Sequence, residues 1–246
     1  MVGTERRALV MSHQYKGLIC IPNSGEGKVL LTAILSSILE YIVGFILLYA
    51  YKREGSKVAL FFGTSVLLYA VAHTIGGTLL STIKSQYNYD VTKFVNDPNY
   101  KAFESLRNFL VGAFMGLALL GISELLQVTG QSSRAKWVRL YAVAGLIAFL
   151  ALRLYCVWGV SNVKHPFFSL AQWVYLIPGS LIIAIVGLTL YKMGGTQGTL
   201  LIALSFLIYA VILPLYAAWK GTQLLNVWYG LRMISDLLLL LGVLRL

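Results

Sequence analysis

Charged side chains are scarce in this chain. Asp, Glu, Lys and Arg together make up only 12% of its 246 residues, whereas hydrophobic residues make up 58%. A soluble domain carries about 25% charged residues, so the composition excludes an ordinary water-soluble fold.

Acidic residues are the scarcest charged class, with 9 Asp and Glu against 20 Lys and Arg, which gives a net charge of +11. The basic residues are scattered over short polar segments and form no stripe or nucleic-acid-binding motif. Loop Lys and Arg of this kind set the topology of membrane proteins and meet anionic headgroups. We therefore predict no nucleic-acid partner.

Residues that bind metals are also few. The two cysteines, Cys20 and Cys156, and the three histidines, His13, His73 and His165, lie far apart in the sequence. They match no zinc-ligand spacing, and we predict no metal site. Haem held by His73 would need a second histidine at matching depth, which the sequence does not offer. Whether Cys20 and Cys156 form a disulfide stays open.

The first 28 residues lack the apolar run of a cleavable signal peptide. We expect residues 1–28 to form an N-terminal tail, and either Met1 or Met11 is compatible with translation start.

Long apolar runs, by contrast, are abundant. About 20 mostly apolar residues in a helix cross the roughly 30 Å hydrocarbon core of a bilayer. Seven segments meet this requirement, and polar turns separate them. The sequence therefore predicts an all-α, polytopic bundle of about seven transmembrane helices that occupies residues 29–246, with the lipid bilayer as its surroundings. The predicted spans are residues 29–51, 57–83, 104–127, 136–160, 167–191, 198–219 and 224–246.

Lys and Arg are denser after the first, third and fifth spans and at the C-terminus than in the other connections. The positive-inside rule makes the denser side cytoplasmic. This predicts an N-terminus outside and a C-terminus inside the cell membrane, although the basic residues of the tail favour the opposite orientation. The residues behind this prediction are Lys52, Arg53, Lys57, Arg134, Lys136, Arg139, Lys192 and Arg245.

Ionisable side chains within the spans are the main clue to function. Each is costly in hydrocarbon and needs a partner or water, so such residues are functional candidates. Tyrosines share a helical face with some of them, since Tyr69 lies one turn before His73 and Tyr229 lies three residues before Arg232. We predict that these residues line one outward-facing polar cavity among the first, second, third, fourth and seventh spans. The predicted ligand-binding or proton-binding residues are Glu40, Tyr69, His73, Arg107, Arg153, Tyr229, Arg232 and Asp236.

A purely structural interpretation is also open. Arg232 and Asp236 are four residues apart and can form an intrahelical ion pair. Glu40 can likewise neutralise Arg107 or Arg153.

The predicted topology has seven spans, the N-terminus outside, the C-terminus inside and a polar last span. In these respects it is similar to the topology of microbial opsins. In that family a lysine of the seventh helix binds retinal as a Schiff base, one turn after an aspartate. Here Leu240 follows Asp236 by one turn, and every lysine lies in a loop, in the tail or at a helix end. We therefore predict no retinal Schiff base.

The favoured function is a non-enzymatic transporter or sensor that binds a small polar or anionic ligand, or protons, in the polar cavity. No catalytic residue and no firm cofactor is predicted. The alternative is a membrane anchor subunit of a respiratory or redox complex, with a quinone, or less favourably a haem, near His73. A structural partner of other membrane subunits is the third hypothesis.

Overall fold

The computed structural model describes residues 24–219 and 224–246, and within these ranges every regular element is a helix. Seven helical segments are long and apolar enough to cross a membrane. The predicted fold class is confirmed, and the described chain is that of a multi-pass membrane protein. Its orientation in the membrane stays a prediction.

Four of the seven segments lie in a single α-helix each, one consists of two consecutive α-helices, and two combine α-helix with a π-helical turn. The helices are α2 (Ser24–Glu54), α3 (Lys57–Gly77), α4 (Leu79–Gln86), α5 (Val91–Phe94), α6 (Pro98–Val128), α7 (Ser132–Leu154), α8 (Pro166–Ala171), α9 (Ile177–Lys192), α10 (Gln197–Trp219) and α11 (Leu224–Val243). Two π-helical turns, η1 (Tyr155–Gly159) and η2 (Gln172–Leu176), extend α7 and join α8 to α9.

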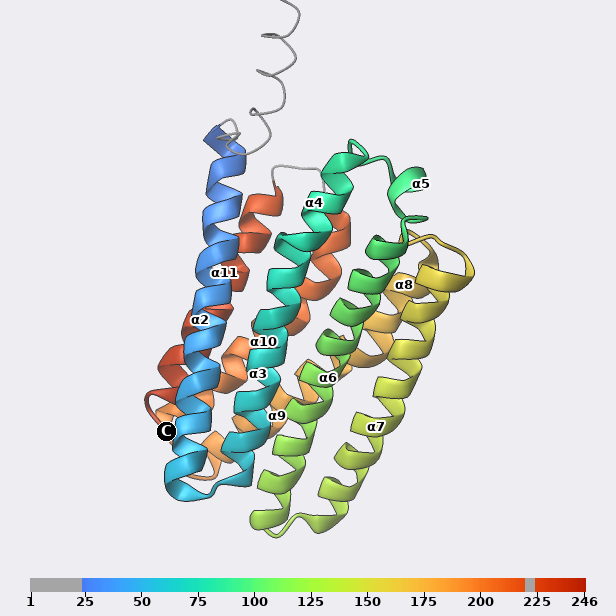
Figure 1. Ribbon diagram of the computed structural model, residues 1–246. Coiled ribbons are helices and arrows are strands. Elements are labelled where there is room, and N and C mark those ends of the chain that lie inside the picture. The colour runs from blue at the N-terminus through green and yellow to red at the C-terminus, as the bar shows by residue number, and fades with distance from the viewer. Residues whose placement is uncertain (1–23, 220–223) are drawn as a thin grey trace, which may run out of the picture.

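The long helices form a closed ring in chain order. Each span packs against the next, with α7 meeting the fifth span through α8 and η2, and α11 packs against α2, so that the first and last spans are neighbours. Figure 1 shows α2, α3, α6 and α7 side by side, with α9, α10 and α11 behind them. This closure brings residues from the two ends of the sequence to the same depth of the bundle.

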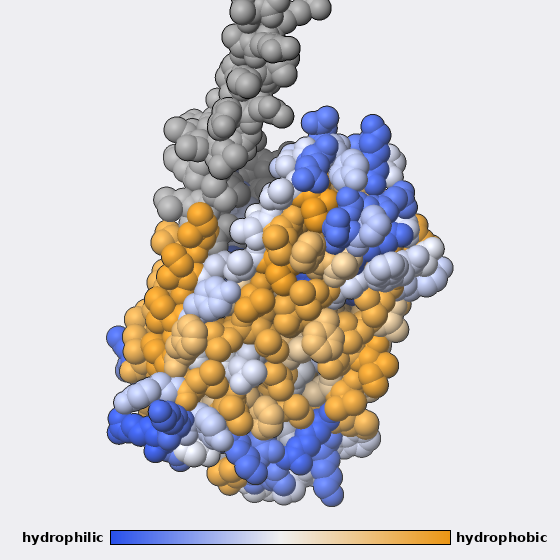
Figure 2. Space-filling view, in the orientation of Figure 1, coloured by the Kyte–Doolittle hydropathy of each residue, from blue (hydrophilic) through white to orange (hydrophobic). Residues whose placement is uncertain are grey.

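The surface divides into an apolar band and two polar ends. Figure 2 shows hydrophobic residues around the middle of the bundle and hydrophilic residues at both ends. Phe45 of α2, Ile147 of α7 and Ile185 of α9 each expose more than half of their area, as lipid-facing residues do. We call the end with the α2–α3, α6–α7 and α9–α10 connections the basic end, and the end with residues 87–97 the long-loop end.

The connection at the long-loop end has its own packing. The Asp97 carboxylate accepts hydrogen bonds from the backbone N–H groups of Asn99 and Tyr100 and caps α6. Pro98 takes the first helical position, where its missing N–H costs nothing. Phe94 and Tyr100 pack together beneath the connection. As a result α6 begins at Pro98, six residues before the predicted start at Glu104.

Candidate functional site

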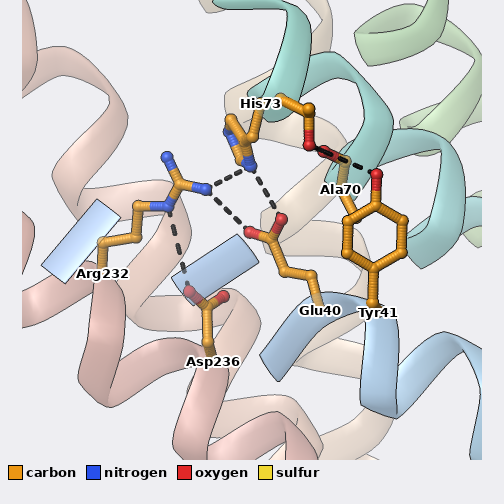
Figure 3. A network of polar contacts seen from close by, with 7 residues as sticks. Glu40, Tyr41, Ala70, His73, Arg232 and Asp236 are labelled. Atoms are coloured by element: carbon orange, nitrogen blue, oxygen red, sulfur yellow. Dashed lines mark hydrogen bonds and ion pairs between the residues drawn. The ribbon is translucent and has the colours of Figure 1, made fainter. Parts of the chain in front are cut away.

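Four ionisable side chains meet inside the bundle, and we call them the central cluster: Glu40 from α2, His73 from α3, and Arg232 and Asp236 from α11. Figure 3 shows them pointing toward one another from three helices. Arg232 Nη2 donates to Glu40 Oε1 at 2.7 Å, and His73 Nδ1 lies 2.8 Å from Glu40 Oε2. Arg232 Nη2 also contacts His73 Nδ1. Asp236 Oδ2 lies 3.9 Å from Arg232 Nε, which is an ion pair without a hydrogen bond.

The cluster lies deep in the bundle. Glu40 is 14 residues before the end of α2 at Glu54, and His73 is 16 residues after the start of α3 at Lys57. At about 1.5 Å per residue, both lie roughly 20–24 Å from the basic end. Glu40 is 1% exposed, and Arg232 and Asp236 are each 8% exposed. These charges therefore meet each other rather than solvent.

The charges of the central cluster do not balance. Two carboxylates face one guanidinium and one imidazole. With His73 neutral the cluster carries one excess negative charge, and one bound proton makes it neutral. His73 Nδ1 is close to both Glu40 and Arg232, so its hydrogen-bonding role depends on which cluster atom carries that proton. Arg232 Nε and Asp236 Oδ2 are buried without a hydrogen-bond partner among the described residues.

Aromatic rings enclose one side of the cluster. The Tyr69 ring lies edge-on to His73, with centroids 3.9 Å apart, and stacks on Phe114 at 4.3 Å. The Arg232 guanidinium lies 5.5 Å from the Tyr69 ring and 5.9 Å from the Trp228 ring. Tyr229, the other predicted site tyrosine, packs edge-on against Trp228. Tyr69 therefore contacts both His73 and Arg232 of the cluster, whereas the ring contact of Tyr229 is with Trp228.

The structure places the other two predicted arginines in a second group, nearer the long-loop end. Arg107 Nη2 donates to Glu104 Oε1 at 2.6 Å on α6. Arg153 on α7 has its guanidinium carbon 3.6 Å from the Phe168 ring centroid, and no described residue forms an ion pair with it. Asn108 Nδ2 donates to the same Glu104 oxygen at 3.4 Å. We call Glu104, Arg107, Asn108 and Arg153 the arginine group.

The two groups are adjacent along α3. A Cβ atom added to Gly76 would lie 3.4 Å from Arg107 Cδ, and Gly76 is only three residues after His73. The Arg107 side chain therefore lies beside this turn of α3. The six ionisable residues of the sequence prediction thus divide into two neighbouring groups. Glu40 pairs with Arg232 and His73, not with the Arg107 or Arg153 of the structural interpretation.

Arg153 is the least compensated charge in the described part of the chain. It is 3% exposed, and its Nε has no hydrogen-bond partner there. A desolvated cation–π contact is worth about 2 kcal/mol. Burial of an ion costs several kcal/mol even after the surroundings relax. The contact with Phe168 therefore offsets only part of the cost.

Glu104 and Asn108 were missed by the sequence analysis. Glu104 is 1% and Asn108 2% exposed, whereas the predicted third span began at Glu104 and made this residue terminal. The Asp97-Pro98 pair is a recognisable helix-start pattern that would have moved the boundary.

Other candidate features lie elsewhere. Two hollows of about 320 and 520 Å³ lie at the basic end, between the α6–α7 connection and α9. Cys156 is buried in η1, and Cys20 lies outside the described residues, so their pairing is untested. His165 caps α8 through Nδ1 at the long-loop end, and His13 lies outside the described residues. Within residues 24–219 and 224–246, no three metal-binding side chains come together.

Comparison of the chain with protein-family models, with curated proteins and with solved structures gave no match in any of the three. The proposals below depend on the geometry.

Proposed function

We propose that this multi-pass membrane protein is a proton-coupled transporter and that the central cluster is its proton-binding site. The observation that carries the proposal is the meeting of two carboxylates with one guanidinium and one imidazole, deep in the bundle and on three helices. A charge left in hydrocarbon is expensive. A bound, exchangeable proton makes the cluster neutral without a charge from outside it.

The placement of the cluster suits coupling to a conformational change. Glu40, His73 and Arg232 come from α2, α3 and α11, and α11 is held to α2 by packing and by the Arg232–Glu40 ion pair rather than by a short connection of the chain. A proton that binds Glu40 weakens its attraction for Arg232 and changes what holds α11 to α2. A single protonation event thereby alters a helix–helix contact, which is what alternating access requires.

The test is a proton current. The full chain is reconstituted in liposomes on a solid-supported membrane, and a pH jump is applied across it. We expect a current with the wild-type protein and its loss in Asp236→Asn, which removes one titratable carboxylate and keeps the shape of the side chain. Glu124→Gln is the matched control, because Glu124 pairs with Arg139 at the partly exposed basic end.

Two results contradict the proposal. One is a wild-type current no larger than that of empty liposomes, and the other is a wild-type current in Asp236→Asn. Loss of the current in both variants would also contradict it, since the effect would not be specific to the central cluster.

A second candidate function, a quinone-binding anchor subunit, has one specific observation in its favour. The His73 ring lies beside Tyr69, which stacks on Phe114, and quinones bind between hydrogen-bonding and aromatic side chains. Organic extraction of the purified protein followed by absorbance spectroscopy tests this. A stoichiometric quinone, lost in His73→Leu, and large subunits that co-purify would favour the anchor over the transporter. Co-purified subunits without quinone or proton current would favour the structural partner.

A further inference from the structure

The arginine group lies outside the central cluster and has an unbalanced charge of opposite sign. Arg107 and Arg153 are positive, and Glu104 is its one carboxylate. Glu104 pairs with Arg107 at 2.6 Å, which leaves Arg153 without a counter-charge among the described residues. One excess positive charge therefore lies in this part of the bundle.

The packing of α6 against α7 puts Arg153 opposite the turn that holds the other members. A Cβ atom added to Gly112 would lie 3.1 Å from the Phe149 ring, and Trp158 Nε1 donates to the Ser105 hydroxyl at 2.8 Å. The two helices are consecutive spans that run in opposite directions. Between these two contacts, the antiparallel alignment puts Arg153 level with Asn108.

The unpaired atoms of the group are those that a small oxyanion would use. Arg107 Nε and Arg153 Nε are buried donors without an acceptor among the described residues. Guanidinium groups present planar sets of N–H donors that match carboxylate-like oxygens. Glu104 Oε2 is a buried acceptor that also lacks a partner, and an O–H of the ligand or of a water molecule would satisfy it.

Burial and charge limit the size and charge of the ligand. Arg153, Glu104 and Asn108 are each 3% exposed or less, so little space is open around them. The Arg107 side chain keeps 33% exposure and is the accessible member. A single negative charge balances the single excess positive charge, whereas a divalent anion would leave a new imbalance in hydrocarbon.

We propose that Arg153 and Arg107 form a binding site for a small monovalent oxyanion between α6 and α7, near the long-loop end of the bundle. This inference rests on the proposed function and deepens it, since the oxyanion would be the solute whose binding and release are coupled to those of the proton. Arg107 packs on Gly76, three residues after His73. The anion site and the proton site therefore touch the same part of α3, and a change in one alters the field at the other.

The first experiment measures binding without transport. The full chain in detergent is unfolded thermally with increasing sodium nitrate, sodium acetate or sodium hydrogencarbonate, at constant ionic strength set with sodium gluconate, whose anion is too large for the buried group. A ligand that binds the folded state raises Tm in a saturable way. We expect such a rise for at least one of the three probes in the wild-type protein.

The variants locate the site. Arg153→Gln removes the unpaired guanidinium, and we expect it to abolish the saturable rise. Arg139→Gln removes an arginine from the same helix, α7, at its partly exposed ion pair with Glu124, and we expect the rise to persist. Equilibrium dialysis of radiolabelled acetate against the wild-type protein, with nitrate and hydrogencarbonate as competitors, gives an answer that does not depend on the folding of any variant.

The results separate the oxyanion site from a purely structural cation–π pair. A wild-type protein that shows neither a saturable Tm rise nor retention in dialysis overturns the inference, and Arg153 then only packs on the Phe168 and Phe149 rings. An Arg153→Gln protein that responds as the wild type does overturns it too. Proton currents without oxyanion binding contradict this inference only, whereas oxyanion binding without proton currents contradicts the proposed function only.

Discussion

Two Arg–Glu ion pairs of nearly equal length lie at very different depths. Arg232–Glu40 is 2.7 Å long, with side chains 9% and 1% exposed. Arg139–Glu124 is 2.6 Å long, with side chains 40% and 23% exposed, and Arg139 also donates to Gln127. At 4 Å the attraction between unit charges is about 1 kcal/mol in water and about 4 kcal/mol at an effective dielectric constant of 20. We therefore expect two ion pairs of nearly equal length to contribute differently to stability because their surroundings differ.

The largest difference in stability is expected when the glutamate is removed from each pair. Glu40→Leu strands Arg232 deep in the bundle with Asp236 at 3.9 Å, and we expect a loss of about 3–5 kcal/mol in the free energy of unfolding. Glu124→Leu leaves Arg139 near water, and we expect a loss of about 0–1 kcal/mol. Chemical denaturation of both variants in the same detergent measures the difference. Equal losses would mean that water reaches the central cluster freely.

The second prediction compares the two carboxylates of the central cluster, Glu40 and Asp236. Asp236→Leu leaves the Arg232–Glu40 contact in place and removes one of the two carboxylates that compete for Arg232. We expect a loss of about 1–2 kcal/mol, clearly smaller than that of Glu40→Leu. The same denaturation experiment ranks the two. A larger loss for Asp236→Leu would identify Asp236, rather than Glu40, as the main partner of Arg232.

The third prediction concerns Asp97, whose pKa is set by hydrogen bonds rather than by burial. The hydroxyl of Tyr87 donates a hydrogen bond to Asp97 at 2.8 Å. This bond, together with those from two backbone N–H groups, lowers the pKa of Asp97 below its usual value of 3.8. A lowered folded-state pKa stabilises the protein above the unfolded pKa, and the gain is lost as the pH falls through the folded pKa. Asp97→Ala removes the cap of α6 and should cost about 1 kcal/mol at pH 7.

Thermal unfolding between pH 7 and pH 3 checks the sign. The Tm difference between the wild type and Asp97→Ala should shrink as the pH falls below about 4. Asp97→Asn is the control, because asparagine also caps helices but does not titrate. A difference that stays constant with pH would mean that the ionised form of Asp97 is not what stabilises α6.

The fold could be predicted because the membrane imposes a simple rule on the sequence. Seven apolar runs of sufficient length predict seven helices, whatever the details of packing. The same rule marks Glu40, His73, Arg232 and Asp236 as residues that need partners. It also marks Arg107 and Arg153, but it gives depth only, and depth does not show which helices are neighbours.

The partners themselves depend on long-range packing. Glu40 and Arg232 are 192 residues apart, and they meet because α11 closes the ring against α2. No local pattern encodes that closure, and for this reason Asp236, four residues from Arg232, was the more visible partner in the sequence. Glu104 escaped notice for a local reason, since the start of α6 was set too late.

The smallest expected effect is that of salt, which should weaken the exposed ion pair and leave the buried one unchanged. Salt screens exposed charges, with a Debye length of about 10 Å at 0.1 M and about 3 Å at 1 M, and it acts much less on buried pairs. A double-mutant cycle of Arg139→Gln and Glu124→Gln should give a coupling energy of about 0.5 kcal/mol at low salt that approaches zero at 1 M sodium gluconate. The corresponding cycle of Arg232→Gln and Glu40→Gln should keep its coupling energy over the same range. A coupling energy at the central cluster that falls with salt as steeply as at the basic end would mean that ions enter the bundle, and the proton would then not be needed to balance the charge.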